Sequence, residues 1–110
     1  MEISKELLSE VLKEKVESFS VHGYILEYSA PLTGFNKAIC IHELAHKCKE
    51  WAYSKGYSIY TGLLNGRWEV VSKISELFSD ERIEFKHEFQ ADSEPESIFK
   101  ACQLILDNDN

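Results

Sequence analysis

The stretch KAICIHELAHKCKEWAYSKG at residues 37–56, continued by YSIYTGLLNGRWEVVSKI at residues 57–74, decides the fold class. Apolar residues in the first part recur at helical spacing and predict a helix over residues 37–55. Gly56 ends this helix because glycine adopts the left-handed backbone conformation without strain. In the second part, Asn65-Gly66 separates two strand-like runs, which strongly favours an antiparallel hairpin. A helix joined to a hairpin predicts an α+β protein.

A third strand is predicted directly after this hairpin. Residues 82–91 (RIEFKHEFQA) alternate strictly between apolar and polar types, as in a strand with one buried and one solvated face. His87 falls on the buried face, where we expect a hydrogen-bonded core histidine. The last helix follows: Ser93 and Glu96 have capping-box spacing, and Pro95 is tolerated in a first turn. Its predicted inner face comprises Ile98, Phe99, Ala101, Cys102, Ile105 and Leu106.

The N-terminal third predicts one further helix and at least one strand. Ser4 can cap a helix over residues 5–15, whose apolar stripe would include Leu7, Leu8 and Val11. Residues 17–28 form either one strand or two short strands folded over His22-Gly23, and a loop follows over 29–36. The expected order is helix, strand or hairpin, helix, three-stranded antiparallel meander, helix. We therefore expect one layered α+β domain over residues 1–110 with flanking helices, frayed at 107–110.

Composition places this domain in the cytoplasm. The chain has 110 residues, and its longest wholly apolar run, residues 38–41, is four residues long. A membrane-spanning helix needs about 20 apolar residues, so no membrane association is expected. The first ten residues lack the apolar stretch of a secretory signal. Three cysteines without a CxxC pair suit a reducing compartment rather than a disulfide framework.

The charge balance argues against direct nucleic-acid binding. The chain has 19 acidic and 12 basic residues, for a net charge of −7, and its only arginines are Arg67 and Arg82. Phosphate binding relies on clustered basic side chains, which are missing here. An acidic protein can instead imitate nucleic acid, which requires carboxylates spaced like phosphates along one face. The lysines interleaved with the acids favour an ordinary solvated surface, and the acidic mimic is one alternative.

The sequence HELAH at residues 42–46 matches the HExxH signature of zinc metallopeptidases. Histidines four residues apart lie one above the other on a helix and can bind one Zn²⁺. In this alternative His42 and His46 are the zinc ligands, and Glu43 is the general base that activates the metal-bound water.

Two observations weigh against the peptidase. The sequence KCKEWA after the motif lacks the usual third ligand, while Glu69 falls on a predicted strand and Glu76 in a turn. On a helical wheel His42 and His46 lie opposite the apolar face, so they should point to solvent instead of a walled cleft. We therefore expect no catalytic residue and no metal or other cofactor, with zinc as the alternative.

The remaining reactive and aromatic residues suggest packing or a protein contact. Cys48 and Cys102 fall on core faces, where a thiol is usually inert. Aromatic residues of the hairpin lack neighbouring basic residues, which favours packing over the stacking of nucleic-acid bases. If a partner binds, the polar face of the strand over residues 82–90 and the adjacent hairpin are the expected surface, with Arg82, Glu84, Lys86, Glu88, Trp68 and Tyr60 as its contact residues.

Three helical segments carry a resemblance: SKELLSEVL (4–12), ELAHKCKEWAYSKGYSI (43–59) and ADSEPESIFKACQLIL (91–106). The chain resembles small bacteriophage and prophage proteins, of the phage α/β/α-sandwich type. The resemblance implies expression in the cytoplasm of an infected or lysogenic bacterium. Small acidic phage proteins of this class often bind and block a host protein, such as a CRISPR effector or a restriction enzyme. The expected function is therefore non-enzymatic binding of a host bacterial protein.

Overall fold

The computed structural model describes residues 3–30, 35–63, 70–76, 87–91 and 93–108, which form three helices and six strands. Their order confirms the α+β class. The elements are α1 (Lys5–Leu12), β1 (Ser18–His22), β2 (Ile25–Ala30), β3 (Phe35–Cys40), α2 (Ile41–Ser54), β4 (Tyr57–Leu63), β5 (Val70–Glu76), β6 (His87–Ala91) and α3 (Glu94–Asn108).

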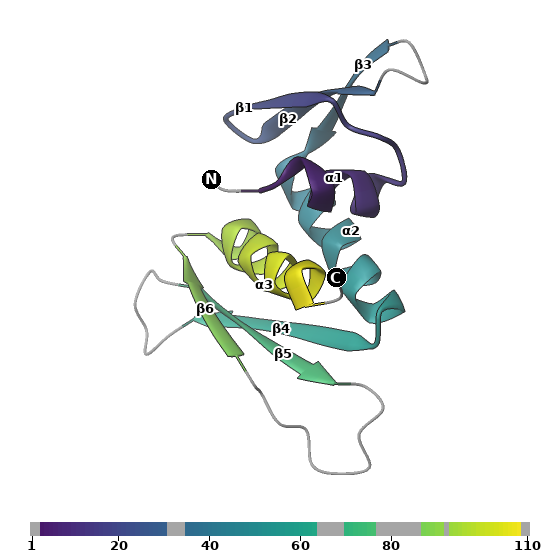
Figure 1. Cartoon of the computed structure of the whole chain (residues 1–110). Helices are drawn as coiled ribbons and strands as arrows, with labels where there is room; N and C mark the ends of the chain where they lie inside the picture. Colours follow the sequence, from purple (N-terminus) through teal and green to yellow (C-terminus); the bar gives the residue numbers. More distant parts are fainter. Residues whose placement is uncertain (1–2, 31–34, 64–69, 77–86, 92, 109–110) are drawn as a thin grey trace.

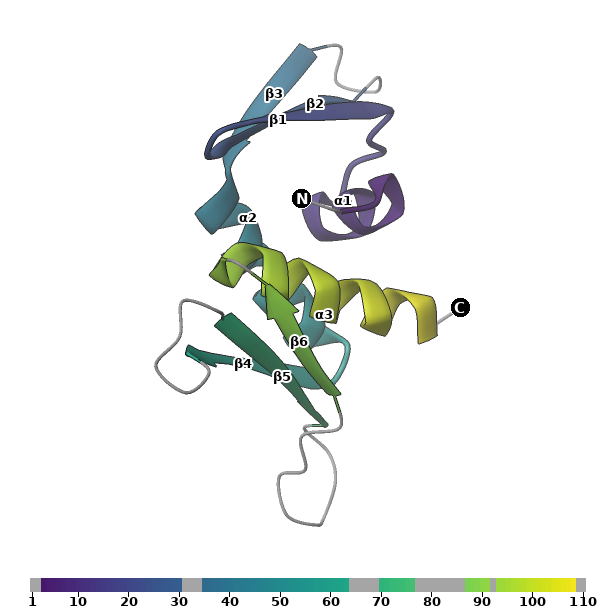
Figure 2. The ribbon, with the colours of Figure 1, turned by 90° about the vertical axis from the view of Figure 1, so that its left-hand side faces the viewer.

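The strands form two three-stranded antiparallel sheets, with orders β1-β2-β3 and β4-β5-β6. The three helices lie between the two sheets in both ribbon views (Figures 1 and 2). Helix α2 leads from the first sheet toward the second, and α3 packs on the second sheet. The layers therefore run sheet, helices, sheet, whereas the resemblance implies helices on both sides of one sheet.

Helix α1 begins where the sequence predicts and ends earlier. The Ser4 hydroxyl accepts a hydrogen bond from the Leu7 backbone N–H (3.1 Å), which confirms the predicted cap. The expected helix over residues 5–15 stops at Leu12, because Lys13 adopts a left-handed conformation (φ 57°). The Ser9 hydroxyl then accepts the Val16 N–H (3.0 Å) and turns the chain so that Val16 enters the core.

Residues 17–28 form the hairpin alternative, since β1 and β2 pair on either side of Gly23, where φ is +62°. The prediction that residues 37–40 begin the long helix is wrong. These residues belong to β3, where Lys37 to Cys40 pair with Tyr28 to Ile25 of β2. Their burial alternates, with Ile39 buried and Ala38 exposed, which is the period of a strand. Residues 31–34 of the expected loop lie outside the described residues.

Helix α2 starts directly after β3, with Cys40 as its N-cap and no intervening loop. Its buried face comprises Ile41, Leu44, Ala45, Cys48, Trp51 and Ala52. The helix ends as predicted, because Gly56 takes φ +94° and its N–H donates to the Tyr53 carbonyl (3.0 Å). Helix α2 contacts both β3 of the first sheet and β4 of the second sheet. Its buried face therefore packs between the two sheets.

The second sheet and α3 confirm the predicted C-terminal order. Strand β5 lies between β4 and β6, and the turn predicted at Asn65-Gly66 falls outside the described residues. The Glu96 N–H donates to the Ser93 hydroxyl (3.4 Å), and all six predicted inner-face residues of α3 are buried. Helix α3 includes Asp107 and Asn108, which we expected to be frayed; the Gln103 amide donates to the Asp107 carboxylate (3.0 Å) one turn later.

One hydrophobic cluster joins the helices to both sheets. Leu7 and Leu8 of α1, Leu26 of β2, Leu44 of α2 and Phe99 of α3 are among its fully buried members. A second long-range link is polar, since the Ser4 hydroxyl donates to the Gln103 side-chain oxygen of α3 (2.8 Å). None of the described helices combines the length and apolar content of a membrane span.

Candidate functional site

The HELAH residues lie in the first turns of α2 on its exposed side. His42, Glu43 and His46 are all exposed, while Leu44 and Ala45 between them are buried in the core. The helical-wheel prediction for the two histidines is therefore confirmed. The same register that buries Leu44 and Cys48 turns the imidazoles away from the core.

The hairpin between β1 and β2 reaches the start of α2 and contacts His42. The Ile41 backbone N–H donates to the Tyr24 carbonyl (2.8 Å), which places the hairpin turn against the first residue of the helix. The Tyr24 ring then stacks on the His42 ring, with centroids 5.8 Å apart and an interplanar angle of 26°. This stacking restrains a side chain that is otherwise exposed to solvent.

His46 is also held by a neighbour. Its Nε2 lies 2.8 Å from a carboxylate oxygen of Glu50, one helical turn further on, and both side chains are mostly exposed. The carboxylate can accept a hydrogen bond from this ring nitrogen, which leaves Nδ1 for another ligand.

Two exposed tyrosines flank the histidines. Tyr24 is 72% exposed and Tyr53 is 64% exposed. Tyr53 lies eleven residues after His42, which is three helical turns along the same side of α2. We define the α2 outer face as Tyr24, His42, His46 and Tyr53.

Helix α2 has two acidic and two basic residues (Glu43, Glu50, Lys47 and Lys49), so it is charge-balanced in a chain of net charge −7.

Within the described residues, no three His, Cys, Asp or Glu side chains are grouped closely enough to hold a metal ion. Glu69, considered as a third ligand, lies outside the described residues, as does the side chain of Glu76. The described part of α2 and its neighbours therefore offers a metal two histidine ligands rather than the three protein ligands of a catalytic zinc site.

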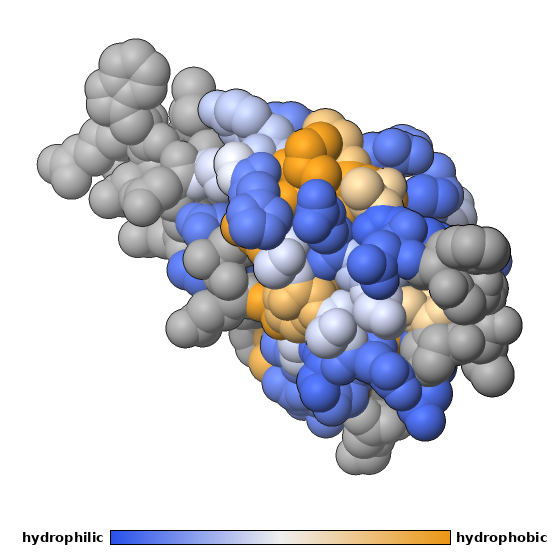
Figure 3. All heavy atoms as spheres, turned by 90° about the horizontal axis from the view of Figure 1, so that it is seen from above, coloured by the Kyte–Doolittle hydropathy of each residue, from blue (hydrophilic) through white to orange (hydrophobic). Residues whose placement is uncertain are grey.

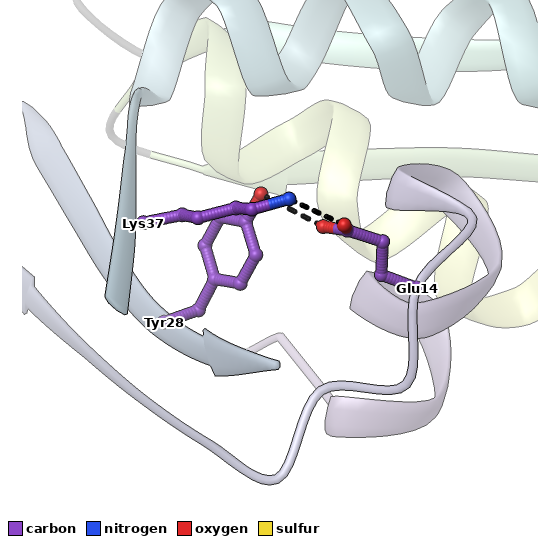
Figure 4. Close-up of polar contacts among 3 residues, drawn as sticks. All are labelled: Glu14, Tyr28 and Lys37. Carbon is purple, nitrogen blue, oxygen red and sulfur yellow. Dashed lines mark hydrogen bonds and ion pairs between the residues drawn. The ribbon is translucent and has the colours of Figure 1, made fainter. Parts of the chain in front are cut away.

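A polar cluster ties the first sheet to the turn after α1 (Figure 4). The Lys37 ammonium of β3 forms a short ion pair with Glu14, and the Tyr28 hydroxyl of β2 donates to the other Glu14 oxygen (3.3 Å). The hydrogen bond from Lys37 lowers the pKa of Glu14 and raises the pKa of Lys37. Burial is the main cause that raises the pKa of Tyr28. All three partners are engaged with one another, so this cluster positions the sheet.

A groove of about 490 Å³ lies between α1, α2 and the first sheet. Trp51, which is 8% exposed, contributes to its wall, and the buried Trp51 indole N–H has no hydrogen-bond partner in the described structure. The charged side chains of the groove are Lys13, Lys47, Glu43 and Glu50, which balance one another. The formal charges that line the groove therefore sum to zero.

Two of the three cysteine thiols lie in the core. Cys48 and Cys102 are fully buried, and the Cys102 thiol donates to the Cys48 carbonyl (3.4 Å). The hydrogen bond to Cys48 and burial together raise the pKa of Cys102 far above its usual range, so its thiolate is suppressed. Cys40 is half-buried, and all three cysteines are free.

The structure describes only part of the partner surface expected from the sequence. Arg82, Glu84, Lys86 and Trp68 lie outside the described residues. Tyr60 is exposed on β4, and Lys73 of β5 stands opposite both Tyr60 and Glu88 of β6 in the sheet register. Tyr60 and Glu88 are thus separated by the central strand and do not lie on adjacent strands.

The outer surface of the first sheet is mainly polar. Ser18, Ser20, Glu27, Ser29 and Asn36 line a shallow depression on it. Seen from above, hydrophilic side chains dominate this end of the molecule and interrupt the apolar areas (Figure 3). Among the residues that the structure describes, this surface shows no continuous apolar patch of the kind that marks many docking sites.

The sequence pointed to His42 and His46 but not to Tyr24, which stacks on His42. The contact depends on β3, because the β2–β3 pairing returns the chain to the hairpin turn just before α2 begins. Residues 38–41 are all apolar, so the sequence offers no polar–apolar alternation that would have marked this strand. No family model, no curated protein and no solved structure matches the chain.

Proposed function

We propose that the protein is a non-enzymatic binding module that contacts a partner protein through the α2 outer face. The observation that carries this proposal is the exposure of Tyr24 and Tyr53 on either side of the two histidines. Tyrosine is enriched at protein interfaces and among the residues that dominate binding energy, because its ring buries much area at low entropic cost.

The local charge supports an aromatic contact over an electrostatic one. Helix α2 has equal numbers of acidic and basic residues, so the chain's net charge of −7 is carried by other segments. Burying Tyr24 and Tyr53 requires no large unpaired charge of this helix to be desolvated. The Ile41–Tyr24 backbone hydrogen bond fixes the relative position of the hairpin and α2, so the face is partly preorganised.

We propose a bacterial host protein in the cytoplasm as the partner, and inhibition of a host defence system, such as a CRISPR effector or a restriction enzyme, as the outcome. The resemblance of three helical segments to phage and prophage proteins supports this partner class. The non-enzymatic part of the proposal is supported by the exposed placement of His42, Glu43 and His46, since a zinc peptidase needs a shielded metal-bound water.

The test uses the tag-free chain and a Tyr24→Ser/Tyr53→Ser double variant as baits in bacterial lysate. A partner identified by mass spectrometry is purified, and its affinity for each chain is measured by calorimetry. We expect a 1:1 complex that the double variant weakens by about 30-fold, the effect of losing about 2 kcal/mol of interface energy.

Tyr60→Ser is the matched control, because Tyr60 is an exposed tyrosine on the other sheet. The affinity of the Tyr60→Ser variant for the purified partner should equal that of the unaltered chain. Loss of binding in Tyr60→Ser with full binding by the double variant would move the interface to the second sheet. Repeated capture that returns no stoichiometric partner would contradict the proposed function itself.

A further inference from the structure

We propose that His42 and His46 form one half of a zinc site, which the same two histidines of a second copy of this chain complete. Zinc would thereby join two copies through their α2 helices. This inference goes beyond the proposed function, because its ligand is a metal ion and its partner is the chain itself.

The first argument is the spacing of the two ligands. His42 and His46 are four residues apart in the continuous helix Ile41–Ser54, so their side chains leave the helix on one side, one turn apart. Both are exposed, and an ion can reach them without moving the core. Paired imidazoles at this spacing can bind one Zn²⁺, at Zn–N distances of about 2.0 Å.

The second argument is that both rings are already held. His42 stacks on Tyr24, and His46 contacts the Glu50 carboxylate through Nε2 at 2.8 Å. Zinc-bound histidines almost always give their second ring nitrogen to a carboxylate, a carbonyl or a water, which orients the ring and increases its basicity. Glu50 is placed to serve His46 in this way, and Nδ1 of His46 remains for the metal.

The third argument is the number of ligands. Structural zinc prefers four protein ligands in a tetrahedron, and the described residues offer only two here. A two-fold axis through the metal supplies the other two from the same residues of a second copy, as symmetric dimer interfaces require. The charge balance of α2 means that two such helices approach without strong repulsion, and Tyr24 and Tyr53 would be covered on both copies.

The test titrates tag-free protein with zinc chloride. Sedimentation velocity gives the molecular mass, and elemental analysis of the dialysed protein gives the zinc content. We expect the mass to double and the zinc content to reach one ion per two chains. His42→Ala and His46→Ala should each stay monomeric at zinc concentrations that saturate the unaltered chain. Both side chains are exposed, and circular dichroism verifies that the variants fold.

His22→Ala is the matched control, since His22 is an exposed histidine outside the pair, beside the Ser20 hydroxyl (3.1 Å). It should dimerise like the unaltered chain. Glu50→Gln should need about tenfold more zinc to dimerise. A tenfold loss is the lower end of the loss of metal affinity when an orienting carboxylate is removed.

Three results would overturn this inference: one zinc per monomeric chain, no dimer at any soluble zinc concentration, or a zinc-dependent dimer that both histidine variants still form. The titration contains no partner protein, so its outcome is independent of whether lysate capture succeeds. If both proposals hold, zinc should reduce partner binding, because the dimer covers the α2 outer face.

Discussion

At the scale of single residues, the Glu14–Lys37 ion pair shows how one contact can position a sheet. Glu14 lies after α1, in the turn that Ser9 closes, and Lys37 lies on the edge strand β3. Tyr28 on the central strand adds a hydrogen bond to the same carboxylate. Both side chains are only partly buried, so the pair contributes little to stability compared with a buried core residue. Its main effect is geometric, because it joins two strands to the chain after α1.

The ion pair predicts a pH dependence of stability. Because Lys37 lowers the pKa of Glu14 below the ordinary 4.5, the Glu14 contribution is present above that value and is lost as the pH falls through the lowered pKa. Lys37→Met should therefore lower the free energy of unfolding at about pH 7, and the difference from the unaltered chain should narrow by about pH 3. Urea unfolding at both pH values measures this.

Lys15→Met is the control for that prediction, because Lys15 is an exposed lysine next to Glu14 in the same turn. It should change stability little at either pH. A Lys37→Met difference that stays constant from neutral to acid pH would show that the lysine acts through packing of its aliphatic chain rather than through its charge.

At the scale of elements, helix ends with a strong local signal are predictable from the sequence. Strand β3, which depends on pairing with β2, is not. Gly56 and Ser93 mark helix ends in the sequence and do so in the structure. Residues 37–40 read as helix because they precede a strongly helical segment, and only their hydrogen bonding to β2 makes them a strand. That pairing is a tertiary effect, which local propensity does not contain.

The β1–β2 hairpin gives a prediction at this scale. Gly23 has φ +62°, and a Cβ added there meets no atom within 4 Å, so only backbone conformation opposes a side chain. Gly23→Ala should lower the free energy of unfolding by about 1 kcal/mol. Gly23→Asn should cost clearly less, because asparagine adopts this conformation more readily.

Chemical denaturation of both variants measures the difference. Equal losses for alanine and asparagine would mean that the turn changes its conformation on substitution. The result matters for the candidate site because this turn places Tyr24 on His42.

At the scale of the whole molecule, the fold class was predictable and the layer order was not. Most elements, and the buried face of α3, can be identified from the sequence. This is because the apolar residues of a buried face recur with the period of the helix or strand that carries them. The separation into two sheets on opposite sides of the helices depends on which strands pair, and β3 was absent from the prediction. At the candidate site, the helical wheel correctly predicted that His42 and His46 are exposed. The contact of Tyr24 with His42 depends on the pairing of β2 with β3, which was not predicted.

The charge distribution predicts weak salt dependence of partner binding. Because α2 is charge-balanced, the affinity for a purified partner should change by less than about threefold between about 50 and about 200 mM NaCl. An acidic nucleic-acid mimic would bind a basic partner mainly through charge, so its affinity should fall far more steeply over this range. Calorimetry at the two salt concentrations distinguishes the α2 outer face from that alternative.

The hydrogen bond between Ser4 and Gln103 has a consequence for synthesis of the chain on the ribosome. It joins α1 to α3 across 99 positions, so α1 emerges long before its partner helix is made. The first sheet and α2 can pair while the remainder is translated, but the core surface that α3 covers stays open until then. Completion of the fold thus waits for the last helix, and the nascent chain exposes an apolar helix layer that chaperones can bind.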